Sequence, residues 1–180
     1  MSPQPHPSIN SLLALVAVGG VAVLASYVYF LPRVLPRAAN GLNALWFGID
    51  GLSRSFYYVS IVLSALCFLA SFIWLLVSDD AHARHNVNRT LAPYSVFFVG
   101  AVLWSVALWT WGQHAPSSWV TRTFVVFALT LTTVGAVWLL IEYVQALRAP
   151  WWACVFVAYL MFHVGLLDNV GWVLAFVKAT

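Results

Sequence analysis

The sequence has very few charged residues. Asp, Glu, Lys and Arg make up 7% of its 180 residues, whereas hydrophobic residues make up 63%. A water-soluble domain has about 25% charged residues. Because so few charges cannot cover a surface that faces water, lipid must be the solvent for most of the chain. The composition therefore excludes an ordinary soluble domain and predicts an integral membrane protein.

Basic runs, cysteines and catalytic motifs are scarce as well. The net charge is only +3, and the basic residues are scattered, so we expect no binding to nucleic acid. Cys67 and Cys154 both lie in apolar runs, which makes a disulfide framework unexpected. We find no glycine-rich phosphate loop, no pair of catalytic carboxylates and no nucleophile beside a base. The sequence therefore favours a protein that is not an enzyme.

The chain contains five apolar runs, each longer than the roughly 20 residues that a helix needs to cross a bilayer. The predicted spans are residues 9–31, 56–77, 92–112, 119–144 and 149–177. Pro32 is expected to end the first span, and the pair Gly19-Gly20 to let another helix backbone approach it. The loop of residues 38–55 could lie on the membrane surface. We predict an all-α integral membrane protein, a five-transmembrane-helix bundle that forms a single domain over residues 1–180.

The distribution of Lys and Arg predicts an orientation. If the N-terminus is outside, the inner segments hold Arg33, Arg37, Arg54, Arg122 and Lys178, and the outer segments hold Arg84, Arg89 and Arg148. This excess favours an outer N-terminus and an inner C-terminus. Most of the ten tryptophans, Trp172 among them, lie near predicted span ends, as in an aromatic belt. Trp104 and Trp138 lie deeper and could line a cavity or simply pack.

The last apolar run holds two ionisable residues that could lie at membrane depth, His163 and Asp168. Ionisable side chains in spans are candidates for function, although a neutral imidazole bonded to a neighbouring helix would also explain His163. Five positions along an α-helix correspond to roughly 140° of rotation, so we do not expect the two side chains to pair directly. Asn169 and Gly171 indicate an irregularity in this helix.

Charged partners are predicted for the two carboxylates near span ends. Asp168 is expected to pair with Arg54 or Arg122, and Glu142 with Arg148.

A metal or haem site is not expected. His82 and His85, together with Asp79 and Asp80, have the residue types of a metal site, but they lie in a polar loop without fixed geometry. A haem held by two histidines would need a second histidine at the depth of His163, and the other histidines lie in the tail or in loops.

The second half of the chain resembles the translocator protein family, also called tryptophan-rich sensory proteins. The last span of that family opens with a Pro-aromatic motif and runs to an Asp-Asn pair, as Pro150-Trp151 and Asp168-Asn169 do here. The resemblance implies an apolar or planar ligand, of the porphyrin or sterol class, bound between helices. The expected ligand-binding residues are Trp104, Trp138, Tyr159, Phe162 and His163, with Asp168, Asn169 and Glu142 as polar intramembrane or interface residues.

The chain departs from that family at ligand-pocket and sterol-motif positions. Cys154, Phe162 and Leu167 stand where the family has a tryptophan, an asparagine and a basic residue. Two alternatives therefore stay open. The protein could be an accessory or structural subunit of a larger membrane complex that contacts protein, pigment or lipid. Its expected partners are membrane lipids and either a second copy of the chain, in a homodimer, or that larger complex. It could also carry protons or ions along Asp168, His163 and Glu142.

Overall fold

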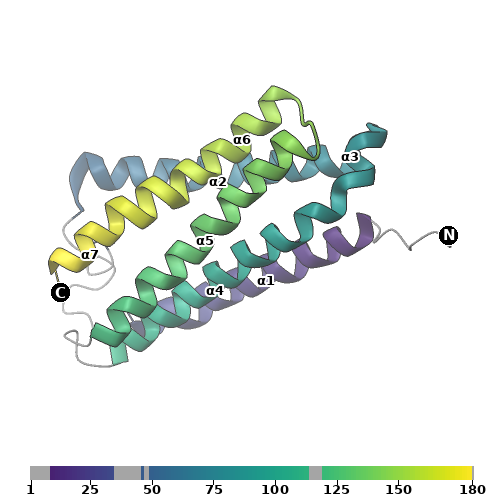
Figure 1. The fold of residues 1–180 in the computed structure, drawn as a ribbon. Coiled ribbons are helices and arrows are strands. Elements are labelled where there is room, and N and C mark those ends of the chain that lie inside the picture. The colour runs from purple at the N-terminus through teal and green to yellow at the C-terminus, as the bar shows by residue number, and fades with distance from the viewer. Residues whose placement is uncertain (1–8, 35–45, 47–48, 114–118, 180) are drawn as a thin grey trace.

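The computed structural model describes residues 9–34, 46, 49–113 and 119–179, which are helical with short connections and contain no strand. Five helical segments are long and apolar enough to cross a membrane. They are α1 (Ile9–Val34), α2 (Gly51–Val77), α4 (Leu91–Gln113), α5 (Trp119–Gln145) and a last helix made of α6 (Trp151–Met161), η4 (Phe162–Trp172) and α7 (Val173–Ala179) (Figure 1). The predicted all-α bundle of five transmembrane helices is confirmed.

Two predicted helix ends and one predicted loop differ from the structure. α1 continues through Pro32 to Val34, because a proline in the last turn removes only one hydrogen bond. α2 begins at Gly51 rather than at residue 56. The expected polar loop before α4 contains two short helices, α3 (Ala81–Asn86) and η3 (Val87–Thr90). The predicted surface segment in residues 38–55 lies largely outside the described residues.

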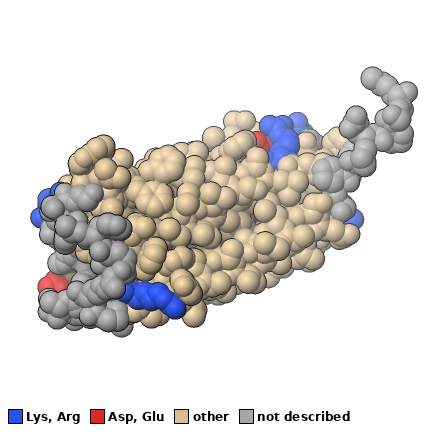
Figure 2. Space-filling model, turned by 90° about the horizontal axis from the view of Figure 1, so that it is seen from below, with Lys and Arg blue, Asp and Glu red and all other residues tan. Residues whose placement is uncertain are grey.

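Consecutive long helices run in opposite directions, so each end of the bundle contains the first residues of some helices and the last residues of others. We call the end with Ile9, Val77, Leu91 and Gln145 the N-side, and the end with Val34, Gly51, Gln113 and Trp119 the C-side. On the face that Figure 2 shows, charged residues lie near these two ends and the surface between them is uncharged. This is the distribution that a lipid environment requires.

Helices α4 and α5 pack closely as antiparallel neighbours, as the short connection between them predicts. A Cβ atom added at Gly100 would lie 2.5 Å from the backbone nitrogen of Thr132, and one added at Gly135 would lie 2.5 Å from that of Phe97. The two glycines therefore allow the helix backbones to approach, which is how helices commonly associate in lipid. α1 packs against α4, and α2 packs against α6.

The predicted role of Gly19-Gly20 is only partly correct. A Cβ atom added at Gly19 would lie 2.4 Å from a ring carbon of Phe98, whereas one added at Gly20 would meet nothing within 4 Å. Gly19 therefore makes room for an aromatic ring of α4 rather than for a backbone.

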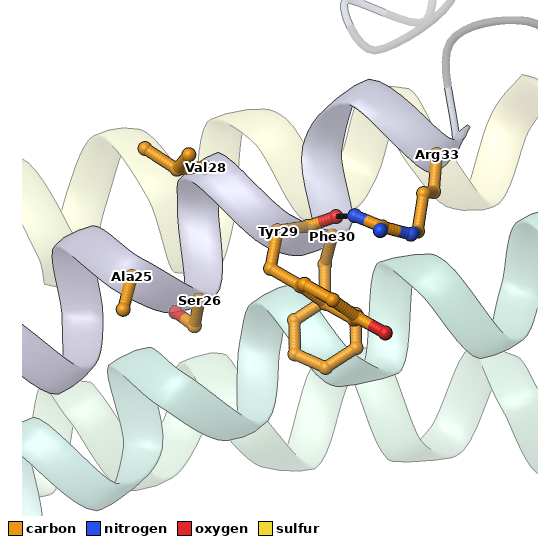
Figure 3. Close-up of a pocket in the computed structure, with 6 residues that line it drawn as sticks. All are labelled: Ala25, Ser26, Val28, Tyr29, Phe30 and Arg33. Atoms are coloured by element: carbon orange, nitrogen blue, oxygen red, sulfur yellow. Dashed lines mark hydrogen bonds between the residues drawn. The ribbon is translucent and has the colours of Figure 1, made fainter.

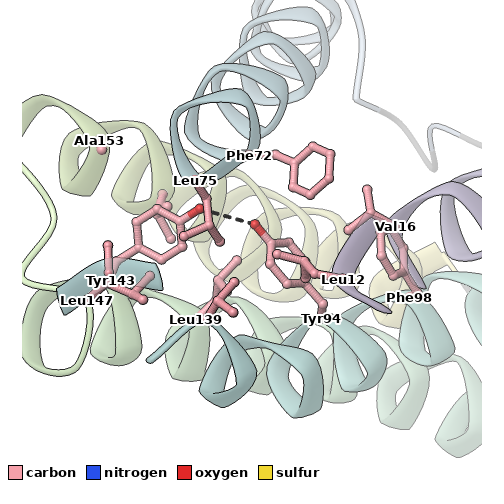
Figure 4. Packing of buried hydrophobic residues seen from close by; sticks show 13 residues of the cluster. Leu12, Val16, Phe72, Leu75, Tyr94, Phe98, Leu139, Tyr143, Leu147 and Ala153 are labelled. Atoms are coloured by element: carbon pink, nitrogen blue, oxygen red, sulfur yellow. Dashed lines mark hydrogen bonds between the residues drawn. The ribbon is translucent and has the colours of Figure 1, made fainter. Parts of the chain in front are cut away.

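Aromatic rings fill the N-side half of the bundle between α2 and α4 (Figure 4). The ring of Phe68 lies 5.8–6.4 Å from four others, those of Phe72, Tyr94, Phe97 and Phe98. The hydroxyls of Tyr94 and Tyr143 are 3.2 Å apart, and Tyr143 donates to the carbonyl of Ser71 at 3.0 Å. This half is a packed core with satisfied hydroxyl groups, so it is a poor place for a ligand.

Candidate functional site

Four polar side chains connect α2 with the last helix near the middle of the bundle. Tyr159 donates a hydrogen bond to Ser60 Oγ at 3.1 Å, and Ser60 Oγ lies 2.9 Å from His163 Nδ1. The other ring nitrogen, His163 Nε2, lies 3.6 Å from Asp168 Oδ2. Ser60 and His163 are both buried. We call Tyr159, Ser60, His163 and Asp168 the polar chain.

The proximity of His163 and Asp168 corrects the prediction that they would not pair. Residues Phe162–Trp172 form a π-helical segment rather than an α-helix. The hydrogen bonds of a π-helix join residues five apart, which brings side chains five positions apart onto one face. The predicted irregularity near Asn169 and Gly171 is therefore present, and it extends over the whole of η4.

Side chains from neighbouring helices bond to two carbonyl groups of this wide segment. Thr133 on α5 donates to the carbonyl of Val164 at 3.2 Å, and Tyr57 on α2 donates to the carbonyl of Leu167. Gly171 makes the second contact possible, because a Cβ atom there would lie 2.9 Å from the Tyr57 hydroxyl. These hydroxyl donors fix η4 against both α2 and α5.

Aromatic rings from α1, α4 and η4 pack together in the C-side half of the bundle. The ring of Trp104 is 5.7 Å from that of Tyr27 and 5.8 Å from that of Trp172, and both pairs meet edge to face. Trp172 also stacks on Phe176. Trp172 is buried, so its assignment to an aromatic belt is wrong. Among the described residues, the buried Nε1–H of Trp104 finds no hydrogen-bond acceptor.

Asp168 lies beside these rings and remains accessible. The exposed fraction of its side chain is 29%. Tyr57 donates to the carbonyl of the preceding residue, Leu167, and Trp172 lies on the same π-helical segment as Asp168. We call Tyr27, Tyr57, Trp104, Asp168 and Trp172 the Asp168 site. It combines one accessible carboxylate with aromatic side chains from α1, α2, α4 and η4.

The residues predicted for ligand binding do not surround a single cavity. Tyr159 and His163 belong to the polar chain, and Trp104 belongs to the Asp168 site. Phe162 contacts the ring of Tyr159 at 5.8 Å. Trp138 lies on the outer surface of α5, where 38% of it is exposed.

The two remaining polar residues of the prediction have partners of their own. Asn169 Oδ1 accepts a hydrogen bond from Thr130 at 3.5 Å. Glu142 accepts one from Trp138 Nε1 at 3.1 Å. Its carboxylate pairs with Arg89 at 2.9 Å rather than with Arg148. Helix η3, unexpected from the sequence, brings Arg89 to this carboxylate.

The predicted arginine partners of Asp168 also require correction. The ion-pair partner of Asp168 is His163, because the π-helical segment brings the two side chains together. Arg54 instead donates from Nε to the carbonyl of Ile49 at 3.0 Å.

Proton or ion transport along Asp168, His163 and Glu142 would need a continuous polar file. His163 and Asp168 lie 3.6 Å apart, whereas Glu142 pairs with Arg89 and accepts a hydrogen bond from Trp138. Among the described residues, no hydrogen bond or ion pair joins these two groups, so the geometry gives no support to transport along them.

The structure describes the loop that contains His82 and His85 only in part. Asp79 pairs with Arg84 at 3.0 Å, and both side chains are largely exposed. The side chain of His82 lies outside what the structure describes. Within the described ranges, no three His, Cys, Asp or Glu side chains come together as a metal site would require.

Sequence reasoning missed Ser60 and Tyr57, although a signal was present. Four polar residues of α2 are buried, Tyr57, Ser60, Ser64 and Ser71. Their spacing of three, four and seven positions matches one face of a helix. A polar stripe along an otherwise apolar span indicates contact with protein rather than lipid. Tyr27 has no comparable signal in α1.

A shallow groove of about 620 Å³ lies on the outer surface of α1 (Figure 3). Its lining residues are Ala25, Ser26, Val28, Tyr29, Phe30 and Arg33. Arg33 folds back over the ring of Tyr29, 3.6 Å from its centre, and donates to the Tyr29 carbonyl. None of the predicted site residues lies in this groove, whose apolar lining suits contact with lipid.

Comparisons with known proteins do not place the chain in a family. No protein-family model matches the chain, and neither a curated protein nor a solved structure matches it. The resemblance to the translocator proteins therefore stays a prediction, and the function is argued from the site alone.

Proposed function

We propose that this multi-pass membrane protein binds a small apolar, planar ligand of the porphyrin or sterol class at the Asp168 site. The observation that carries this proposal is a carboxylate that remains 29% exposed among aromatic rings from several helices. Small-molecule sites are typically apolar and aromatic, with a few polar groups that orient the ligand. The Asp168 site has this composition.

The unsatisfied indole of Trp104 supports the same proposal. A buried N–H group without an acceptor costs about 1–3 kcal/mol, and no acceptor for Trp104 Nε1 exists among the described residues. A carbonyl, hydroxyl or ring nitrogen of a ligand would satisfy it. The adjoining rings of Tyr27 and Trp172 offer apolar surface to a ring system.

The wide helix beside the site is a second supporting feature. π-helical segments are rare and frequently occur at functional sites. Here the segment directs Asp168 towards His163, whose ring is fixed by Ser60. The carboxylate therefore lies at a defined place beside a buried polar chain. Precise placement of a single polar group is what discrimination between similar ligands needs.

The test is a binding titration of the purified protein in phosphatidylcholine nanodiscs. Protoporphyrin IX and cholesterol are titrated separately, with quenching of tryptophan fluorescence and competition with a labelled sterol as the respective readouts. We expect Trp104→Ala and the milder Trp104→Phe to weaken binding about tenfold or more, since an aromatic anchor is worth several kcal/mol. Trp138→Ala serves as the matched control, because Trp138 lies on the outer surface of α5.

The effects of the Trp104 and Trp138 variants on ligand binding decide whether the proposed function is correct. Binding that is weakened by the Trp104 variants and not by Trp138→Ala supports the Asp168 site. If neither ligand binds, or if the Trp104 and Trp138 variants behave alike, the proposed function is wrong. Elution volume and helix content of each variant show whether the bundle still assembles.

A further inference from the structure

The carboxylate of Asp168 lacks a permanent positive partner. No Lys or Arg in the described part of the chain forms an ion pair with it. Its one charged or chargeable partner is His163, at 3.6 Å, which is longer than a hydrogen bond. The other nitrogen of that imidazole already interacts with Ser60 at 2.9 Å. Glu142, the other carboxylate within the helices described above, is paired with Arg89.

Such a carboxylate needs a proton or a positive charge close by. An ionised carboxylate within a membrane is costly unless a cation pairs with it. Because Asp168 is partly accessible, a ligand can bring that cation to it. The rings around it favour this arrangement, since the faces of Trp and Tyr attract a cation within about 6 Å. Tyr57 donates to the carbonyl of the neighbouring residue Leu167, and Trp172 lies on the same π-helical segment as Asp168. Trp104 contacts the ring of Trp172, and Tyr27 contacts that of Trp104.

We propose that the Asp168 site selects ligands whose planar apolar body carries one positively charged nitrogen. This inference rests on the proposed function. Asp168 is the counter-charge, and the surrounding rings contact the cation and the adjoining ring system. Trp104 Nε1–H donates to a carbonyl, hydroxyl or ring nitrogen in those ligands that carry one. His163 lies 3.6 Å from this carboxylate, and Ser60 fixes its ring. Repulsion from Asp168 weakens the binding of an anionic member of the same ligand class.

The experiment compares ligands that share a skeleton and differ in charge. The sterol set is 3β-aminocholest-5-ene, cholesterol and cholesterol sulfate. The porphyrin set is protoporphyrin IX and the derivative in which one carboxylate is converted to a 2-aminoethyl amide and the other to a methyl ester. Binding is measured with the intact protein in nanodiscs of phosphatidylcholine, which has no net charge and so does not itself concentrate amines.

We expect the amine to bind at least about tenfold more tightly than its neutral or anionic counterpart, as a partly desolvated charge pair with cation–π contacts allows. Asp168→Asn should reduce this preference to less than about twofold, since it removes the charge and keeps the shape. Glu142→Gln is the matched control, because Glu142 is an intramembrane carboxylate outside the Asp168 site, and it should retain the preference.

Each outcome decides between the two proposals. Preference for the amine that Asp168→Asn abolishes and Glu142→Gln retains supports both. Binding that is independent of charge, or a preference that survives Asp168→Asn, overturns selection for a cation and leaves the proposed ligand site standing. If no member of either set binds, both proposals fall. Elution volume and thermal unfolding confirm that Asp168→Asn is assembled before its affinity is interpreted.

Discussion

His163 Nε2 lies 3.6 Å from Asp168 Oδ2, although a regular α-helix would point these two side chains roughly 140° apart. The π-helical geometry of Phe162–Trp172 brings them together. Ser60 on α2 holds the opposite side of the His163 ring. The shape of the last helix and the packing of α2 against it are therefore coupled through three side chains.

Removing the hydroxyl of Ser60 should destabilise the bundle. Ser60→Ala deletes the atom that contacts both Tyr159 and His163. Interhelical hydrogen bonds within membranes contribute about 0.6–2 kcal/mol each, so we expect a loss of about 1–2 kcal/mol in unfolding by SDS titration. Ser64→Ala is the control, because the Ser64 hydroxyl bonds only to a carbonyl of its own helix, that of Ile61. Equal effects of the two substitutions would show that the polar chain does not stabilise the fold.

Adding a methyl group where α4 and α5 approach should disturb their packing. Gly100→Ala would place a carbon 2.5 Å from the backbone nitrogen of Thr132, which cannot move aside as a flexible side chain could. Overpacking costs about 1–3 kcal/mol, and we expect a loss of this size. Gly20→Ala, which meets nothing within 4 Å, should be neutral or stabilising by up to about 1 kcal/mol. A neutral Gly100→Ala would mean that the helices are farther apart than described.

The partner of Glu142 can be tested by charge removal. Arg89→Gln should lower the free energy of unfolding by on the order of 1–2 kcal/mol, because it leaves a carboxylate that is only 8% exposed without its cation. The expected loss is smaller than for a fully buried ion pair, because the Arg89 side chain is 56% exposed and water screens its charge. Arg148→Gln should leave stability unchanged. If Arg148→Gln lowers the free energy of unfolding more than Arg89→Gln does, Glu142 pairs with Arg148 rather than with Arg89.

The hydroxyl of Tyr57 should hold the wide segment of the last helix. Tyr57→Phe removes the donor to the carbonyl of Leu167 and keeps the ring. We expect faster hydrogen exchange in residues 162–172 and a loss of about 0.5–1.5 kcal/mol. Tyr58→Phe is a neighbouring control whose side chain is exposed. Unchanged exchange in Tyr57→Phe would show that η4 keeps its shape without this contact.

The sequence predicted the number of spans and most of their ends, because a bilayer imposes length and apolar composition directly. It did not predict which way each span faces. In lipid the outer surface of a helix is as apolar as its inner surface, so periodicity in hydropathy is weak. Trp104 and Trp138 illustrate the point. Both lie deep in their spans, yet the indole nitrogen of Trp104 is buried inside the bundle and Trp138 lies on its outside.

The site was harder to predict than the fold, since it depends on local helix geometry. Counting positions at 3.6 residues per turn separates His163 from Asp168, and only the wider π-helix brings them together. Partners from other helices, such as Ser60 and Arg89, depend on rotation and on the unexpected helix η3. Polar spacing along α2 was the one signal in the sequence that could have indicated Ser60.

Native mass spectrometry of the protein released from its own membrane tests the central claim most directly. We predict the 19.9 kDa chain, alone or in a small multiple, with an added mass that matches a planar apolar ligand. This mass should be retained in Trp138→Ala and lost in Trp104→Ala. A bare chain in every variant, or a chain found only inside a much larger assembly, would contradict ligand binding and favour a subunit of a membrane complex.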